Sequence, residues 1–434
     1  MLRRSSGLIA ALSLGLAMPA GAQQVTPSDS LLRAAIQGIR MPIGATTCGL
    51  SGAGGELLAE LAGQAQFTII GEAHGVSDVP RFSGALFCRL VASGYKHLAI
   101  EVSPPTAVEL NRRAAAANPV AEIQRFGEER FPGAPFYMLR EEAELLSKAV
   151  GARRGAPGVL WGIDYDVNPE GQLFHRLAAL ATPASRPSTN RLKVVAESMY
   201  TAALAAKNPS RVFAFAGADS LVAAVRRDLR PAKGSEADRL LAVLEQTLRI
   251  NRLWNDGQGY ESNRARSENL RENFLVHYRA ASRSGPAPRA MIKLGASHSY
   301  RGRSLVNTFD VGSLVPELAA ELGRTSVGIM LVGGNGSQDA LFDINTFSYA
   351  PVPGAYNNVA WLRPFYALAD SSAWTLFDLR RLRPPLTQGR LGTVAAGAQQ
   401  AIFGFDFLVV LGGSKPSEPL PLKRPAWGAV PAGR

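Results

Sequence analysis

Short apolar runs alternate with helical segments through the middle of this 434-residue chain, and this alternation constrains the fold more than any other feature. Five runs rich in β-branched residues read FTII, HLAIE, VLWGIDYD, AMIKLG and SVGIMLVGG. Such runs are typical of strands, and the segments between them have helical periodicity. Strands that alternate with helices form a largely parallel sheet. We therefore predict an α/β fold with a mainly parallel central sheet, flanking helices and a helical cap inserted between strands.

The segments around these strands predict the domain organisation. The helix VPRFSGALFCRLVASG ends at Gly94, a natural C-terminal cap. Two helical stretches, near 105–150 and 191–283, are too long for simple crossovers and predict a cap that walls off a pocket. Later runs, VAWL, WTLFDL and FDFLVV, predict late or edge strands. The α/β domain therefore spans 66–412, after a lead-in at 23–65 that carries one early helix and a short helix before the first strand.

Both ends of the chain have distinctive compositions. The first 22 residues combine a basic start, a short apolar stretch and the small residues before Gln23, which is the pattern of a bacterial secretory signal. No apolar run reaches the roughly 18 to 20 residues of a membrane span. Residues 413–434 are rich in proline and basic residues, which predicts a disordered tail. We expect a periplasmic or secreted protein, cleaved after Ala22, with no transmembrane span.

Export bears on the two cysteines and on the charge of the chain. In an oxidising compartment Cys48 and Cys88 can form a disulfide, although spacing alone leaves two unpaired buried thiols as the alternative. The formal net charge is +12, or +10 once Arg3 and Arg4 leave with the signal. Such a surface attracts anions such as envelope lipids, polysaccharide or an acidic substrate. Because the basic residues are scattered and no recognition motif occurs, we expect no nucleic-acid partner.

Three of the apolar runs lead into ionisable residues. The motif GEAHG, at Gly71 to Gly75, follows FTII and delivers Glu72 and His74 where a strand stops. The strand HLAI leads to Glu101, and MIKLG leads to His298. Strand ends in open α/β sheets collect reactive groups, because side chains there project into the crevice above the sheet. If the backbone stays extended, Glu72 and His74 point to the same side.

A histidine beside a carboxylate can act as a general base, because the carboxylate fixes the tautomer and stabilises the imidazolium. This chemistry predicts His74 as the base, with Glu72 and Glu101 as its partners if neighbouring strands bring them within reach, and His298 as a second histidine. The sequence has no GxSxG elbow, HExxH, Walker motif or GxGxxG turn. Cys88 lies on an apolar helix face and is a poor nucleophile. The mechanism that these absences leave is attack by a water molecule that a histidine activates, with or without a metal.

Further polar residues follow the same strands. Arg301 and Arg303 come just after His298, and a guanidinium can hold a substrate carbonyl or an oxyanion. For Arg303, an ordinary surface position is an equal alternative. Asp164 ends the strand in GIDYD and is predicted, like Arg301, to contact substrate. Asp166 follows two residues later, and the sequence VNPE after it predicts that it caps the next helix.

At these residues the chain resembles the erythromycin esterase family and the wider superfamily that joins it to haem-uptake ChaN-like proteins and Tiki proteases. The resemblance covers most of the chain from about Gln66 to Gly412, and its pieces are short but occur in a specific order. They are GEAHG, the strand that ends in Glu101, GIDYD around Asp164, the helix with Arg266 and Asn273, the strand before His298, and FDFLVV.

The resemblance implies a hydrolase. In erythromycin esterases the histidine of the first motif resembles a general base that activates water against a macrolactone ester. Carried over by motif, His74 would be the base, Glu72 and Glu101 its carboxylate partners and His298 the second histidine, while Arg266 would face the pocket and bind substrate. One residue separates Glu72 from His74, where the esterases have two. That shorter spacing is more like the ChaN-like proteins.

Three functions are compatible with these residues. The first is an exported hydrolase that needs no cofactor and acts on a small-molecule ester or an envelope-derived substrate. The second is a metal-dependent hydrolase of the Tiki-like kind, in which His74, Glu101 and His298 would bind a divalent ion and lower the pKa of its water. The third is a haem- or iron-binding envelope protein without turnover, in which Tyr165 and Tyr300 would ligate iron.

Overall fold

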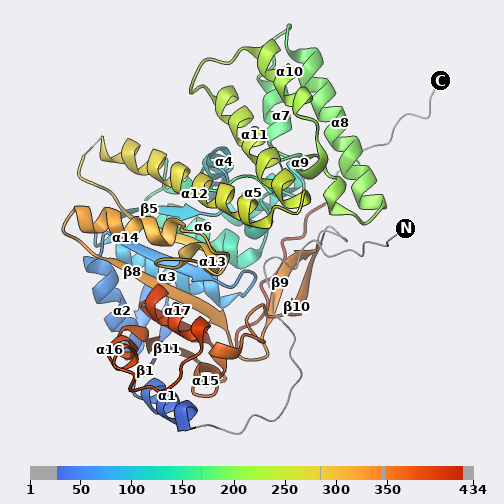
Figure 1. Cartoon of the computed structure of the whole chain (residues 1–434). Helices are drawn as coiled ribbons and strands as arrows, with labels where there is room; N and C mark the ends of the chain where they lie inside the picture. Colours follow the sequence, from blue (N-terminus) through green and yellow to red (C-terminus); the bar gives the residue numbers. More distant parts are fainter. Residues whose placement is uncertain (1–26, 168, 284, 344–347, 424–434) are drawn as a thin grey trace, which may run out of the picture. The chain divides into compact units, whose positions relative to one another are not determined.

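The computed structural model describes residues 27–423 except 168, 284 and 344–347 (Figure 1). The predicted signal peptide, and residues 424–434 of the predicted tail, lie outside the described residues. The chain divides into two compact units. Unit 1 comprises the described residues within Met1–Leu98, Ala281–Leu341 and Pro351–Glu418, and unit 2 those within Ala99–Ala280, Phe342–Ala350 and Pro419–Arg434.

The central sheet is mostly parallel, and the predicted α/β class is confirmed. The strand order is β1 (Arg40–Pro42), β11 (Trp374–Asp378), β12 (Phe407–Leu411), β8 (Ser326–Gly333), β4 (Phe67–Glu72), β7 (Arg289–Gly295), β5 (Tyr95–Ile100) and β6 (Leu160–Gly162). Strand β4 pairs in parallel with β7 on one side and with β8 on the other. All six residues of β4 are buried, which explains why its sequence is apolar on both faces.

The edge that contains β1, β11 and β12 departs from the parallel pattern. Strands β12 and β8 are parallel, but β11 runs antiparallel to β12, and β1 antiparallel to β11. The lead-in therefore contributes a strand to the sheet as well as helix α1 (Pro27–Gln37). The runs WTLFDL and FDFLVV form β11 and β12, whereas the predicted strand VAWL is wrong. Its last three residues form a 3-10 helix, because Pro364 follows closely and cannot donate to a strand ladder.

Helices flank the sheet of unit 1 (Figure 1). Helices α2 (Gly52–Gln64) and α3 (Asp78–Val91) pack against each other and against β8, while α13 (Ala296–Ser299) and α14 (Val311–Glu321) pack against β4. Gly94 adopts a φ of 89°, and its N–H donates to the carbonyl of Val91 (3.0 Å), so the chain turns out of α3 where the sequence predicts.

A disulfide joins Cys48 and Cys88 within unit 1. Cys48 lies in the turn between β2 (Gly44–Thr46) and β3 (Gly49–Ser51), a small antiparallel hairpin, and Cys88 lies on α3. Their Cα atoms are 5.1 Å apart, within the range that a disulfide requires. The bond ties the hairpin to the helix that follows the GEAHG motif.

Unit 2 is predominantly helical, and both stretches that the sequence assigned to helices are helical. Its long helices are α4 (Pro104–Ala114), α5 (Pro119–Glu129), α6 (Arg140–Ala152), α8 (Arg186–Ala205), α10 (Asp219–Leu229), α11 (Glu236–Asn255) and α12 (Gly259–Ser282). Apolar side chains such as Phe174, Leu192 and Leu244 form one of its buried clusters. No helix in the described part of the chain is long and apolar enough to span a membrane.

The first part of the predicted tail is ordered, where the sequence predicted disorder. In unit 1, the N–H of Ser417 donates to the carbonyl of Gly75 (2.8 Å). In unit 2, the N–H of Leu420 donates to the carbonyl of Met138 (3.0 Å), and the Leu420 side chain is buried. Proline-rich composition predicted disorder because prolines weaken regular structure, but the backbone groups between these prolines are hydrogen-bonded to distant segments.

Candidate functional site

The end of strand β4 brings Glu72 and His74 into direct contact in unit 1. Glu72 is in register with Gly295 of β7 and Leu331 of β8, and Ala73 extends the ladder by donating its N–H to the Leu331 carbonyl (3.0 Å). Nδ1 of His74 lies 2.9 Å from Oε1 of Glu72. Both side chains are buried, with relative exposures of 8% and 3%. The two residues therefore form a hydrogen-bonded acid–histidine pair.

Lys293 completes this pair from the neighbouring strand β7. Its Nζ atom lies 2.6 Å from Oε2 of Glu72, and its side chain is fully buried. Burial alone would raise the pKa of Glu72, but the charge of Lys293 and the hydrogen bond from His74 hold that pKa below its usual value. An ionised Glu72 only accepts hydrogen bonds, so Nδ1 of His74 carries the proton. The lone pair of the imidazole then resides on Nε2.

Lys293 was not among the site residues predicted from the sequence. It is the single charged residue inside the apolar part of AMIKLG, and lysine is almost never fully buried unless it is paired. A charged residue inside an otherwise apolar strand was the sequence signal that could have identified Lys293. The sequence alone could not name the partner, because Glu72 and Lys293 become neighbours only through the pairing of β4 with β7.

The loop after His74 is held by two other segments of unit 1. Gly75 has a φ of 78°, and a Cβ atom there would lie 2.3 Å from the carbonyl oxygen of Ala340, so only glycine fits. The carbonyl of Gly75 accepts hydrogen bonds from the N–H groups of Ala340 (2.9 Å) and Ser417 (2.8 Å). The N–H of Ser77 donates to the carbonyl of Lys415 (2.9 Å). The backbone around the proposed base is therefore fixed.

Asp339 is a further buried acid beside this loop. It lies on β9 (Gln338–Asp343), directly before Ala340, and is 1% exposed. Its Oδ2 atom accepts the N–H of Ala355 (2.8 Å), whereas Oδ1 has no hydrogen-bond partner within the described residues. Burial raises the pKa of Asp339, and the N–H of Ala355 and the charge of His74 partly oppose this shift. Asp339 was not predicted from the sequence, because a lone aspartate outside the predicted strands gives no signal of a functional role.

His298 has a carboxylate partner of its own. It lies on the short helix α13 directly after β7, and its Nδ1 atom lies 2.7 Å from Oδ2 of Asp310. The other oxygen of Asp310 accepts the N–H of Val311 (2.7 Å), which starts helix α14. One carboxylate therefore caps a helix and orients the imidazole. The signal for Asp310 was an aspartate before an apolar helical run, the usual pattern of a cap.

Arg301 is committed to a different part of unit 1. Its guanidinium forms two hydrogen bonds with Asp406, at 3.1 and 3.0 Å. Asp406 also accepts the N–H of Gly328 on β8, three residues before Leu331, and Leu331 is level with Glu72. At about 3.3 Å per residue, the ion pair lies about 10 Å along the strand from Glu72. The structure therefore does not bring Arg301 to His74.

Tyr300 lies in the hydrophobic core of unit 1. Its side chain is fully buried and packs edge-on against Phe405, with ring centroids 4.7 Å apart. Burial raises the pKa of its hydroxyl, which disfavours the phenolate that would ligate iron. Tyr165, the other predicted iron ligand, belongs to unit 2. Within the described residues, no group of three or more His, Cys, Asp and Glu side chains is arranged to hold a metal ion.

In unit 2, three residues that the sequence analysis selected converge on one network. Glu101 follows β5, Asp164 follows β6 and Arg266 lies on α12. The NH2 atom of Arg266 lies 2.6 Å from Glu101 and 2.6 Å from Asp164. Its guanidinium also stacks over Tyr165 at 5.3 Å, and Asn273 on the same helix donates to the carbonyl of Ile163 (3.2 Å). Both carboxylates of this network are thus paired with one arginine.

Asp166 does not cap the next helix, so that prediction was wrong. Helix α7 (Leu173–Ala179) begins seven residues later, and its N-cap is Gln172. Asp166 is buried and accepts hydrogen bonds from the hydroxyls of Ser103 (2.5 Å) and Thr106 (3.1 Å) and from the amide of Gln172 (2.8 Å). It ties the start of α4 to the segment before α7.

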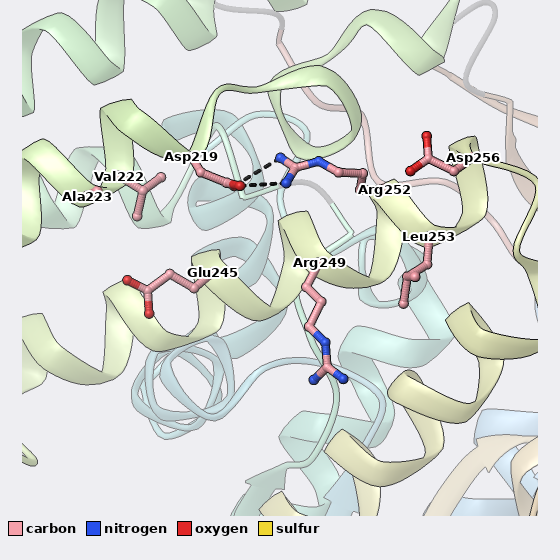
Figure 2. A pocket seen from close by; sticks show the side chains of 8 residues that line it. All are labelled: Asp219, Val222, Ala223, Glu245, Arg249, Arg252, Leu253 and Asp256. Carbon is pink, nitrogen blue, oxygen red and sulfur yellow. Dashed lines mark hydrogen bonds and ion pairs between the residues drawn. The ribbon is translucent and has the colours of Figure 1, made fainter.

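A surface pocket of about 440 Å³ lies elsewhere in unit 2, along α10 and α11 (Figure 2). Arg252 reaches from α11 to Asp219 on α10 and forms an ion pair with it. Val222 and Leu253 supply apolar contacts in the lining. None of the residues selected from the sequence lines this pocket, and it has no acid–histidine pair.

The fold places the chain among α/β proteins with a mostly parallel sheet, and solved structures share this fold. Erythromycin esterase EreC, in the open conformation of a histidine-to-asparagine mutant, has a TM-score of 0.54 and 16% identity, over 85% of this chain and 95% of EreC. A Bacillus cereus protein known by its crystal structure has a TM-score of 0.56 and 14% identity, over 91% and 99%. A succinoglycan biosynthesis protein has a TM-score of 0.52 and 15% identity, over 92% and 100%.

Sequence comparisons find no counterpart of this chain. No protein-family model matches it, and no curated protein matches it. At these identities the structural similarity shows the fold, and residue roles must be argued from the chain's own geometry.

Proposed function

We propose that this protein is a hydrolase in which His74 activates water for attack on an ester or a related carbonyl bond. The observation that carries the proposal is the buried array Lys293, Glu72 and His74, with distances of 2.6 and 2.9 Å. A lysine holds the carboxylate ionised, and the carboxylate fixes the proton of the imidazole on Nδ1. This arrangement prepares Nε2 to take a proton from water.

In the proposed reaction, the water oxygen forms a bond to the carbonyl carbon while one water proton passes to Nε2 of His74. The imidazolium that results is stabilised by Glu72, and Lys293 keeps Glu72 charged throughout. Asp310 orients His298, which we assign to hydrogen bonding with the attacking water or the reacting carbonyl. Collapse of the tetrahedral intermediate then breaks the bond to the leaving group.

The predicted substrate residues have unequal support. Arg266 and Asp164 form a paired network with Glu101 within unit 2, and we keep Arg266 and Asp164 as candidates for substrate recognition and Glu101 as a candidate catalytic carboxylate. Arg301 is held by Asp406 and has no geometric support for this role. The name of one structural neighbour includes esterase, which supports an ester as the substrate class. We propose a small-molecule ester or an envelope-derived ester, because the single residue between Glu72 and His74 departs from the macrolide-hydrolysing pattern.

We further propose that the protein is exported to the periplasm or the medium and that its basic surface favours anionic partners. The disulfide between Cys48 and Cys88 supports an oxidising compartment. The formal net charge of +12 supports attraction to acidic envelope components or substrates.

The test compares wild type with His74→Ala and Glu101→Gln on a panel of aryl, alkyl and lactone esters. We expect His74→Ala to lose at least about 100-fold in kcat/KM, the usual contribution of a general base. His175→Ala is the matched control, because His175 is a half-buried histidine in unit 2. Equal rates for wild type and His74→Ala would refute the proposal.

The same preparations address the two alternatives. Elemental analysis before and after chelation, with activity measured on each sample, separates a metal-dependent hydrolase from one that needs no metal. Absorbance spectra recorded after addition of haemin test the haem-binding alternative, for which a Soret shift is required.

A further inference from the structure

We propose that Asp339 is a further catalytic residue of the site around His74, the acid that protonates the leaving alcohol. The proposal rests on the hydrolase function proposed above and assigns the second half of the same reaction. It is carried by the packing of β9 against the GEAHG loop, by the burial of Asp339, and by a carboxyl oxygen without a hydrogen-bond partner in the described chain.

Strand β9 is attached directly to the loop that carries His74. Ala340 donates its N–H to the carbonyl of Gly75 (2.9 Å), and the missing Cβ of Gly75 allows this close approach. Asp339 directly precedes Ala340 and His74 directly precedes Gly75, so an ionisable residue comes just before each partner of the backbone contact. The charge of a protonated His74 lowers the pKa of Asp339, which agrees with this proximity.

The electrostatic surroundings of Tyr356 agree with a position of Asp339 and Glu72 near each other. The pKa of the half-buried Tyr356 is raised first by desolvation, and then by the charges of both Asp339 and Glu72. Tyr356 follows Ala355, whose N–H holds Asp339. Glu72, His74 and Asp339 therefore lie around a common part of unit 1.

The two oxygens of Asp339 have different roles in the structure. Oδ2 is fixed by the N–H of Ala355, which orients the carboxyl group. Oδ1 is buried and has no hydrogen-bond partner within the described residues. Folded proteins rarely leave a buried polar atom unpaired, and such atoms are frequent at functional sites. An Oδ1 that carries a proton and meets a substrate oxygen would be satisfied in the complex.

The environments of Glu72 and Asp339 favour opposite protonation states. Glu72 lies 2.6 Å from the ammonium group of Lys293, and this contact favours the carboxylate. Asp339 is buried, which favours the protonated acid, and the neutral amide of Ala355 opposes this less than an ion pair would. Two carboxyl groups whose environments differ in this way are typical of an acid and base assignment.

The proposed step is balanced in atoms and charge. Water gives a proton to Nε2 of His74, and its oxygen bonds to the carbonyl carbon. The bond between that carbon and the leaving oxygen then breaks, and the proton of Asp339 passes to this oxygen, so the alcohol leaves neutral. A proton passes from the imidazolium back to Asp339, which restores both residues. The net reaction is ester plus water to carboxylic acid plus alcohol.

The experiment compares two esters of the same acid, one with a nitrophenol and one with an alkyl alcohol as the leaving group. The variant is Asp339→Asn, whose amide oxygen can still accept the N–H of Ala355. We expect the alkyl ester to lose about 100-fold or more in kcat, and the nitrophenyl ester, whose leaving group needs no proton, to lose less than about 3-fold. Ser417→Ala is the matched control, because Ser417 also has a buried, unpaired side-chain oxygen next to Gly75.

Each outcome decides between the proposals. An equal loss on both esters, or no loss on either, would show that Asp339 is structural and would overturn the inference while leaving the hydrolase function intact. If wild type hydrolyses no ester, or if His74→Ala is fully active, the proposed function fails and the role of Asp339 fails with it. If Asp339→Asn does not fold, the role of Asp339 is tested with wild type alone. Its rates are then measured on a series of esters whose leaving alcohols differ in acidity. A steep dependence on alcohol acidity contradicts an acid catalyst, and a shallow one supports it.

Discussion

At the scale of single residues, Lys293 controls the charge of the proposed site. It is fully buried in a central strand, and its ammonium group lies 2.6 Å from Glu72. A buried carboxylate without a nearby cation would become protonated, and a neutral Glu72 would no longer stabilise an imidazolium at His74. The basicity of His74 is therefore linked to a residue one strand away.

We expect Lys293→Met to lower the free energy of unfolding by about 3 to 5 kcal/mol, because it leaves a buried carboxylate without its cation. Activity should fall together with stability. The double variant Lys293→Met with Glu72→Gln should be more stable than Lys293→Met alone, since it removes the unpaired charge. Urea unfolding of wild type, the single variant and the double variant measures these free energies of unfolding. Equal stabilities of the single and double variants would contradict the role assigned to the ion pair.

The sequence predicted site residues where chemistry and position coincide in a short motif, as in Glu72 and His74. It did not predict Lys293, Asp310 or Asp339. Lys293 and Asp339 act on residues that are distant in the sequence and meet them only through strand pairing or the contact between β9 and the loop. Asp310 carries a local cap signal, but its second contact, with His298, depends on how α13 and α14 pack.

At the scale of elements, the segment between β6 and α7 carries two buried acids in unit 2. Burial raises the pKa of Asp166 to about 6 and that of Glu170 to about 7, in both cases against hydrogen bonds that lower it. Glu170 accepts the N–H of Ala214 (2.8 Å) and has no cation among the groups that shift its pKa. This segment is therefore more stable when its acids are protonated.

We expect the stability of unit 2 to fall as the pH rises from about 4.5 to 7. Over this range folded Glu170 retains a proton that the unfolded chain has lost, so its contribution to stability decreases with pH and is fully lost above about pH 7. The loss is about 3 kcal/mol at about 1.4 kcal/mol per pKa unit. Glu170→Gln keeps the acceptor for Ala214 and should flatten the pH dependence. Urea unfolding from pH 4.5 to 8 measures the pH dependence of stability for wild type and Glu170→Gln. If stability changes with pH equally in both proteins, Glu170 is not the group responsible.

The C-terminal segment around Ser417 is a second element with a defined role, because it holds the loop after His74. Ser417→Pro removes the N–H that donates to Gly75, and we expect faster hydrogen exchange at the Ser77 amide, which bonds to Lys415 in the same segment. Ser414→Ala, in the same segment, should leave that exchange unchanged. Equal exchange rates at Ser77 in wild type and Ser417→Pro would exclude this coupling.

The sequence predicted a helix or strand best where its apolar residues form a clear pattern. The strands β4, β7, β8 and β12 are mostly apolar, with Lys293 as the charged residue inside β7, and the sequence located each of them. Strand β1 is three residues long and contains a proline, and β9 with β10 (Ser348–Pro353) forms a separate two-stranded sheet with a mixed polar sequence. Such strands depend on tertiary pairing, and their sequences carry no strong local signal.

At the scale of the whole molecule, the sequence predicted the fold class but not the division into units. The alternation of strands and helices runs through most of the chain, and it favours a mostly parallel sheet. The two units interleave in sequence, with segments near residue 342 and after residue 419 returning to unit 2. Composition does not change at those points, so no local pattern marked them.

The disulfide provides a prediction for the whole protein. The bond between Cys48 and Cys88 spans 40 residues, and closing a loop of that length stabilises a fold by about 4 kcal/mol in the chain-entropy model. We expect the double variant Cys48→Ala, Cys88→Ala to unfold at lower urea concentration than the oxidised wild type. Reduced wild type should behave like the variant. An unchanged midpoint after reduction, with the free thiols verified by alkylation, would contradict a stabilising role.

The bond between Ser417 and Gly75 has a practical consequence for anyone who produces this protein. Truncation of the chain before Lys415 would remove the backbone groups that hold the loop one residue away from the proposed base. A handle placed before the predicted leader would interfere with export. The exposed residues 232–233 belong to neither of these regions, so an insertion there is the better site for a label.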